Sequence, residues 1–300
     1  MVAGKWLLFL LIGFGLLRWG LRLAIKRGGR KVTAIDPRDL IVHSHQSTAT
    51  TNRIVQLEGA YNFRDLGGYQ TSGGRVVQQG RFFRSDEFSE LSDADLETLK
   101  ALGLHTIIDL RNPSEIKGKE NRPIAGSSYQ QIRIYKRDPL MRYMPIALFQ
   151  RHILPKALGD SYIHLIETRA QAFGAALRVL TAEDNLPMVY HCSAGKDRTG
   201  IVVALALSVL GVPTETIIAD YSLSNLGFEH YYTEFIASGR LDRWGVPYED
   251  FQPLFIVDPD WMKNLLAHLY SKYGNVETYL IRKAGLTVED LQSIRKNLLA

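Results

Sequence analysis

The residue types with the clearest chemical potential lie in one short segment, His191 to Gly200, which reads HCSAGKDRTG. It holds Cys192, the single cysteine of the chain, and Arg198 six positions further on. A short apolar run precedes the cysteine and a longer one follows the arginine, which predicts a strand, a loop and then a helix. Backbone N–H groups converge at such a turn, and the helix N-terminus adds partial positive charge. The segment is therefore suited to hold a phosphate group.

The side chains of this loop favour phosphoryl transfer. Gly195 permits a backbone conformation that other residues resist, and Arg198 presents a planar fork that fits two phosphate oxygens. The positive field of the turn favours the thiolate of Cys192, which attacks the phosphorus while Arg198 stabilises charge on the equatorial oxygens. The expected product of this attack is a phosphocysteine intermediate. The neighbouring loop residues are expected to bind the phosphate: Ser193, Ala194, Gly195, Lys196 and Thr199.

Such a reaction also needs a carboxylic acid that protonates the leaving oxygen and later, as a carboxylate, assists the attacking water. Three aspartates are candidates. Asp109 ends a predicted buried strand, where ligands collect in α/β sheets, Asp197 lies inside the loop, and Asp138 directly precedes Pro139. The sequence leaves the choice among the three open. No metal-ligand pattern is visible in the sequence, so neither a metal nor another cofactor is expected.

The elements that must position these residues alternate between strands and helices. Apolar runs predict strands at 106–110, 129–135 and 187–191, and helical spacing or capping signatures predict helices at 92–103, 161–181, 200–210 and after 287. This alternation predicts an α/β fold with a central, mostly parallel sheet flanked by helices. The catalytic domain is expected to span residues 54–300, after a linker at 32–53.

The excess positive charge of the chain is concentrated at the N-terminus. The formal net charge is +5. Residues 1–31 contain seven basic residues and no acidic one, so the remaining residues carry a net charge of −2. A general basic surface for DNA or RNA is therefore not supported.

The same N-terminal segment, residues 1–31, predicts a membrane anchor. Twelve consecutive apolar or glycine residues run from Trp6 to Leu17, and apolar character continues to residue 25 if Arg18 and Arg22 extend toward the headgroups. A retained single-pass anchor is favoured over a helix lying in the interface and over a cleaved signal. Since the basic residues mostly follow the apolar run, the catalytic body is expected in the cytoplasm.

The loop sequence resembles the C-x5-R signature of the protein tyrosine and dual-specificity phosphatases. More narrowly, the chain is similar to the bacterial and fungal tyrosine phosphatase family. The stretches that carry this resemblance are NFRDLGGY at 62–69, GRFFRSD at 80–86, TIIDLR at 106–111, the loop itself, ADYSLSN at 219–225 and YGNVETYL at 273–280. They cover nearly all of residues 54–300 in the family's order.

The resemblance implies hydrolysis of phosphate monoesters on phosphotyrosine or dual-specificity protein substrates, or on phosphoinositides. It places Asp138 where tyrosine phosphatases carry a mobile acid loop, and it likens Lys196 to an extra loop charge of phosphoinositide phosphatases. Residues 139–180 are expected to cover the site. A phosphate-binding module without activity and a sulfurtransferase are the alternatives. The intact nucleophile disfavours the first, and the segment at 62–69 disfavours the second. The sequence leaves the substrate and the oligomeric state open.

Overall fold

The computed structural model describes residues 20, 23, 25, 34–44, 53–136, 139–239, 241–242 and 247–300. Most of the predicted anchor at residues 1–31 lies outside the described residues, and so does Asp138. In the described ranges, no helix has the length and apolar character needed to cross a bilayer. Membrane anchoring therefore stays a prediction of the sequence.

Within the described residues, five strands form one sheet in the order β1-β2-β5-β3-β4. Strands β2, β5, β3 and β4 run parallel, and the short edge strand β1 pairs antiparallel with β2. The predicted mostly parallel sheet is confirmed, with one antiparallel edge. The strands are β1 (Arg64–Asp65), β2 (Phe82–Ser85), β3 (Thr106–Asp109), β4 (Ser128–Gln131) and β5 (Met188–His191).

Alternate side chains of the central strands enter two hydrophobic cores, one on each face of the sheet. In β5, Met188 and Tyr190 join the larger core, whereas Val189 joins the smaller one. In β3, Ile108 belongs to the larger core and Ile107 to the smaller. Since successive side chains of a strand point to opposite faces, a strand buried on both faces must be apolar throughout.

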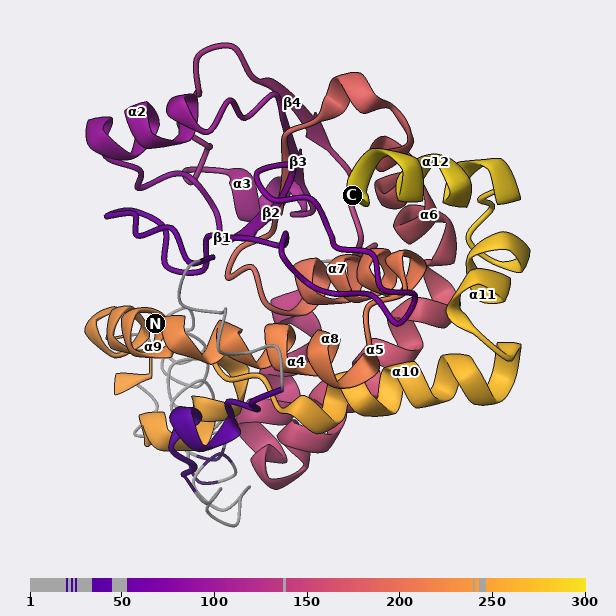
Figure 1. Ribbon diagram of the computed structural model, residues 1–300. Coiled ribbons are helices and arrows are strands. Elements are labelled where there is room, and N and C mark those ends of the chain that lie inside the picture. Colours follow the sequence, from indigo (N-terminus) through magenta and orange to yellow (C-terminus); the bar gives the residue numbers. More distant parts are fainter. Residues whose placement is uncertain are drawn as a thin grey trace, which may run out of the picture.

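Helices cover the two faces of the sheet unequally (Figure 1). Leu99 of α2 packs into the smaller core, while α5, α6, α7, α10, α11 and α12 supply the larger one. Twelve of the fourteen residues of α7 are buried, which makes it the central helix of that layer. The α-helices are α2 (Asp93–Ala101), α3 (Pro113–Ile116), α4 (Pro139–Phe149), α5 (Leu154–Thr168), α6 (Ala170–Arg178), α7 (Asp197–Leu210), α8 (Thr214–Ser222), α9 (Phe228–Ala237), α10 (Pro259–Tyr273), α11 (Val276–Arg282) and α12 (Val288–Leu298).

Two predicted elements differ in the structure. The single helix expected at 161–181 is divided into α5 and α6 at Arg169, whose backbone leaves the helical region and whose Nε–H donates to the carbonyl of Ile134. The strand expected at 129–135 is the shorter β4, an exposed edge strand. The capping boxes predicted at Ser92 and Thr287 are confirmed.

Part of the predicted linker at residues 32–53 lies against the body. The backbone N–H and C=O of Ile35 both bond to the side chain of Gln252, at 3.0 and 2.8 Å. Further upstream, Ile25 is fully buried in the larger core, and its carbonyl accepts a 2.9 Å hydrogen bond from Arg151. Ile25 and Ile35 are therefore both held against the body.

Candidate active site

The predicted phosphate loop lies between β5 and α7. Strand β5 ends at His191 and α7 begins at Asp197, so residues 192–196 connect a buried parallel strand to a helix N-terminus. Cys192 at the start of the loop is a free thiol and only 2% exposed. The predicted order of strand, loop and helix is confirmed.

Four consecutive carbonyl groups of this loop accept hydrogen bonds from outside it. The donors are His191 Nδ1 to Cys192 (3.3 Å), the Glu87 amide to Ser193 (3.2 Å), Asn62 Nδ2 to Ala194 (2.8 Å) and Arg84 Nη2 to Gly195 (2.7 Å). A peptide plane points its N–H opposite to its C=O. Carbonyls held outward therefore turn the N–H groups of the loop inward, where they form a site for an anion.

Gly195 is required by both conformation and space. Its φ is +65°, in the left-handed region that favours glycine. A Cβ atom at this position would lie 2.2 Å from the carbonyl oxygen of Ser85 at the end of β2. Any side chain here would therefore strain the loop and displace the strand beside it.

His191 supports the loop as a neutral side chain. Burial lowers its pKa to about 4, against the opposing effect of Asp109. Arg111 donates to Oδ1 of Asn121, so the amide nitrogen of Asn121 faces His191 Nε2 at 2.8 Å. Because an amide nitrogen can only donate, Nε2 accepts, and the proton on Nδ1 is donated to the carbonyl of Cys192. Through this contact, His191 holds the Cys192 carbonyl in place.

Arg198 is aimed by Glu115, which sequence reasoning missed. Arg198 Nη1 and Nη2 donate to the two carboxylate oxygens of Glu115 at 2.8 and 2.7 Å. Nη1 also lies 3.3 Å from the carbonyl of Leu110. Burial opposes the charge on Glu115, but Arg198 lowers the pKa of that carboxyl below its usual value. Of the five guanidinium donors, only Nε–H has no partner among the described residues, and the second Nη2–H makes a long 3.4 Å bond to Ser193 Oγ. This edge of the fork could bind two phosphate oxygens if the bound phosphate replaces the contact with Ser193.

Asp197, at the first turn of α7, is the candidate acid that the structure places beside the loop. Tyr162 of α5 donates to its Oδ1 at 2.6 Å, and Lys196 Nζ lies 3.0 Å from its Oδ2. The Asp197 side chain remains 27% exposed. Lys196 is nearly buried and also donates to the carbonyl of Ile256 at 3.3 Å, so its charge is directed at protein groups.

Asp109 is placed differently. Its carboxylate is fully buried and accepts hydrogen bonds from Arg111 and, at 2.9 Å, from the Tyr129 hydroxyl. Burial opposes the charge, but His191 and Arg111 hold the pKa of Asp109 below its usual value. The structure thus gives Asp109 the place of a structural ion-pair partner, with no oxygen open to a substrate.

The ring of Tyr135 packs near the Arg198 side chain. The Arg198 guanidinium lies 5.1 Å from the ring centre of Tyr135. Burial is the main cause that raises the pKa values of Tyr135 and Tyr231 well above 10, and the charge of Cys192 contributes to both. Both phenols therefore stay neutral. The buried hydroxyl of Thr199 has no hydrogen-bond partner within the part of the chain that the structure describes.

Comparison with known proteins decides the family. The model of the tyrosine phosphatase family matches residues 55–300. The chain belongs to this family. This phosphatase is 32% identical over 230 residues to a Cupriavidus necator protein named for tyrosine-protein phosphatase activity, covering 73% of this chain and 80% of that one. It is also 32% identical over 210 residues to the triple specificity protein phosphatase PtpB of Mycobacterium tuberculosis, covering 57% of this chain and 69% of that one.

Among solved structures, the core catalytic domain of the PP-IP phosphatase SIW14 from S. cerevisiae is 16% identical, covering 63% of the phosphatase and 98% of that chain. Its TM-score is 0.32, which is too low to carry an argument about function. Family membership and the two bacterial relatives make this chain a cysteine-dependent phosphatase of the tyrosine and dual-specificity type.

Proposed function

We propose that the phosphatase acts on phosphotyrosine in proteins, with Cys192 as nucleophile, Arg198 as phosphate ligand and Asp197 as general acid and base. The observation that carries this proposal is the loop at residues 192–196, whose carbonyls are held outward beside a buried thiol. Its inward N–H groups, together with the Nε–H and Nη2–H edge of Arg198, match the oxygens of a phosphate dianion. The unpartnered hydroxyl of Thr199 offers one more donor.

The reaction then proceeds in two steps. In the first, Cys192 Sγ forms a bond to phosphorus as the bond to the phenolic oxygen breaks, and Asp197 gives that oxygen its proton. In the second, Asp197 takes a proton from water as the water oxygen attacks the phosphocysteine. Inorganic phosphate and the thiolate are released. Arg198 bridges two equatorial oxygens in both steps, and Glu115 keeps its fork in place.

Replacing Asp197 by asparagine is expected to reduce kcat for a phosphotyrosine peptide by about 10²- to 10³-fold, the range of general acid catalysis. An aryl phosphate with a strongly electron-withdrawing ring needs little protonation of its leaving group, so its kcat is expected to fall much less. Steady-state kinetics on both substrates measure this difference. An equal loss on both would mean that Asp197 acts through the geometry of the loop, and the acid would have to be sought elsewhere, Asp138 included.

Three placements support phosphotyrosine over phosphoserine or a lipid headgroup. Cys192 is almost completely buried, which suits the long side chain of phosphotyrosine better than the short one of phosphoserine. Tyr135, whose ring centre lies 5.1 Å from the Arg198 guanidinium, offers aromatic surface to a phenyl ring beside the phosphate ligand. Lys196, likened above to a contact for phosphoinositides, is engaged by Asp197 and Ile256.

Phosphate release by the full chain is the direct test of the substrate class. The panel contains phosphotyrosine, phosphoserine and phosphothreonine peptides, and phosphoinositides in vesicles. We expect the highest kcat/KM on the phosphotyrosine peptides, by at least about tenfold. Faster turnover of the phosphoinositides would overturn the proposed substrate class and return Lys196 to a role in substrate binding.

Location at a membrane is the second part of the proposal. It is supported by the apolar run Trp6 to Leu17 and by the basic residues after it, which favour a cytoplasmic catalytic body. Membrane-bound phosphoproteins would then be the substrates closest to the enzyme. Sedimentation of the full chain with vesicles, compared with a chain lacking residues 1–19, tests this part.

A further inference from the structure

Two neighbouring carbonyls of the phosphate loop are held by side chains from distant parts of the sequence. Asn62 donates to Ala194 at 2.8 Å across 132 residues, and Arg84 donates to Gly195 at 2.7 Å across 111 residues. All of these contacts are buried or nearly so. The inward direction of the N–H groups at this corner of the loop depends on these two donors.

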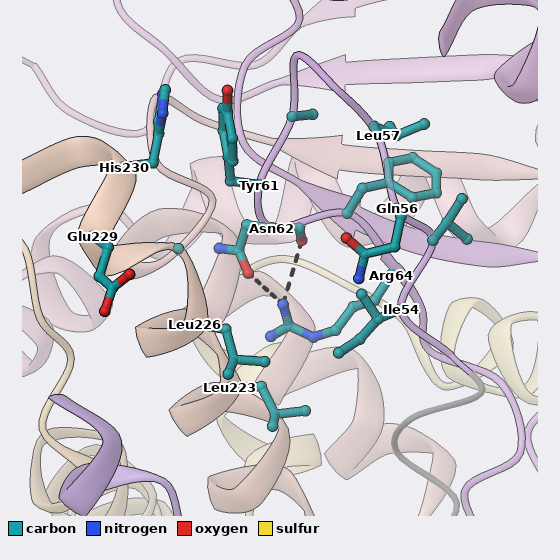
Figure 2. A pocket seen from close by; sticks show the side chains of 14 residues that line it. Ile54, Gln56, Leu57, Tyr61, Asn62, Arg64, Leu223, Leu226, Glu229 and His230 are labelled. Carbon is teal, nitrogen blue, oxygen red and sulfur yellow. Dashed lines mark hydrogen bonds between the residues drawn. The ribbon is translucent and has the colours of Figure 1, made fainter. Parts of the chain in front are cut away.

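Both donors are held, directly or through one intermediate, by the carboxylate of Asp220 in α8. Arg84 Nη1 donates to Asp220 Oδ2 at 2.7 Å, and Arg64 Nε donates to Oδ1 at 2.9 Å. Arg64 in turn bonds through Nη1 to the side-chain and backbone oxygens of Asn62 (Figure 2). The bond to its side-chain oxygen leaves the Asn62 amide nitrogen directed at Ala194.

Asp220 supplies the negative charge that keeps Arg64 and Arg84 together in this cluster. The side chains of Arg64, Arg84 and Asp220 are 3%, 0% and 1% exposed. Burial and the charge of Arg64 lower the pKa of Arg84 to about 10. Burial opposes the charge on Asp220, but Arg64 and Arg84 hold its pKa far below the usual value. Two buried guanidinium groups this close would repel each other without the carboxylate between them.

We propose that Asp220 is a positioning residue for catalysis, which fixes the anion-binding N–H groups of the phosphate loop through Arg84 on one side and Arg64 with Asn62 on the other. The inference rests on the proposed function only in that the loop holds the reacting phosphate. It gives one role to three segments that lie far apart in the sequence. The first contributes Asn62 and Arg64, the second Arg84 and the third Asp220.

The test replaces Asp220 by asparagine in the full chain and measures two quantities. The first is the affinity for inorganic tungstate, a phosphate analogue, by calorimetry. The second is kcat/KM on the best substrate of the panel. We expect tungstate to bind about tenfold more weakly or worse, and kcat/KM to fall about 10²-fold, the loss expected when catalytic donors are displaced by about 1 Å.

A matched control separates positioning from general stability. Asp250 forms a similar buried ion pair with Arg151 at 2.9 Å, and among the described residues neither side chain has a hydrogen bond or ion pair with the phosphate loop. Asp250→Asn is expected to lower the melting temperature while leaving tungstate affinity and kcat/KM per folded protein within about twofold. If Asp220→Asn behaves like this control, the inference is wrong.

A second variant keeps the test decisive if Asp220→Asn does not fold. Asn62→Ala removes the donor to Ala194 without leaving an unpaired buried charge, and it is expected to weaken tungstate binding several-fold. Unchanged tungstate affinity in this variant would overturn the inference. Failure of the proposed function would look different, because the wild-type chain would then bind tungstate yet hydrolyse no substrate of the panel.

Discussion

Replacing Cys192 by serine is expected to abolish turnover, by about 10⁴-fold or more, while the affinity for tungstate stays within a few-fold of the wild type. A hydroxyl at neutral pH is a far weaker nucleophile than a thiolate, so no phosphoenzyme accumulates. The carbonyls of the loop are held by His191, Glu87, Asn62 and Arg84, whose contacts do not involve the sulfur atom. The anion site therefore survives the substitution.

Steady-state phosphate release and calorimetry with tungstate measure the two halves of this prediction. Since the chain has one cysteine, labelling of the unfolded protein with a thiol reagent should give one equivalent for the wild type and none for the variant, which excludes contamination. Turnover above about 1% of the wild type, in a preparation free of labelled thiol, would require a different nucleophile.

The second large effect is expected at Arg198. Replacement by lysine keeps the positive charge beside Glu115 but removes the planar fork, so one ammonium group must serve the carboxylate and the phosphate together. We expect kcat/KM to fall by about 10³-fold, the size of effect seen when an arginine that stabilises a phosphoryl-transfer transition state is lost. Because the transition state carries more charge on the equatorial oxygens than the ground state, kcat should fall more than KM rises.

Glu115→Gln provides the matched variant. It preserves the shape of the partner and one acceptor, but it loses the bidentate pairing at 2.8 and 2.7 Å. An intermediate loss of about 10- to 10²-fold is expected, because Arg198 keeps all its donors and loses only its orientation. If kcat/KM of the Arg198→Lys variant stays within about tenfold of the wild type, the backbone N–H groups alone stabilise the transition state.

The phosphate loop could be predicted from sequence because its chemistry is contiguous. One turn between a strand and a helix contains Cys192, Gly195 and Arg198, and apolar runs in the sequence predict both elements. Capping boxes at Ser92 and Thr287 are equally local, since the two partners are three residues apart. Signals of this kind need no knowledge of how the chain folds back on itself.

The supporting residues could not be found in this way. Glu115 reaches Arg198 across 83 residues, and Asp220 reaches Arg84 across 136. Only the sheet order, which places β2 and β3 on either side of β5, brings their segments to the loop. A local signal for Glu115 exists in retrospect, since Asn112, Pro113 and Glu115 form the start of α3 directly after β3. It predicts a helix start, and it carries no information about the arginine.

The choice among the candidate acids shows the same limit. The position of Asp109 at the end of a buried strand makes it a candidate general acid in the sequence. In the structure, the Arg111 side chain folds back and donates hydrogen bonds to its carboxylate. Lys196 was attractive as a contact for a polyanionic substrate, yet its Nζ lies on Asp197 and the carbonyl of Ile256. Sequence shows which charges are present, whereas tertiary packing decides which of them remain available to a ligand.

If the apolar run inserts into a membrane as proposed, the burial of Ile25 limits how far the catalytic body can stand from the lipid surface. Ile25 is fixed in the hydrophobic core, and the run from Trp6 ends at Leu17, eight residues earlier. Even a fully extended chain covers only roughly 28 Å over eight residues. A lipid surface that takes up the run would therefore keep the enzyme within about one domain diameter of the headgroups, so phosphorylated segments that protrude further would be out of reach.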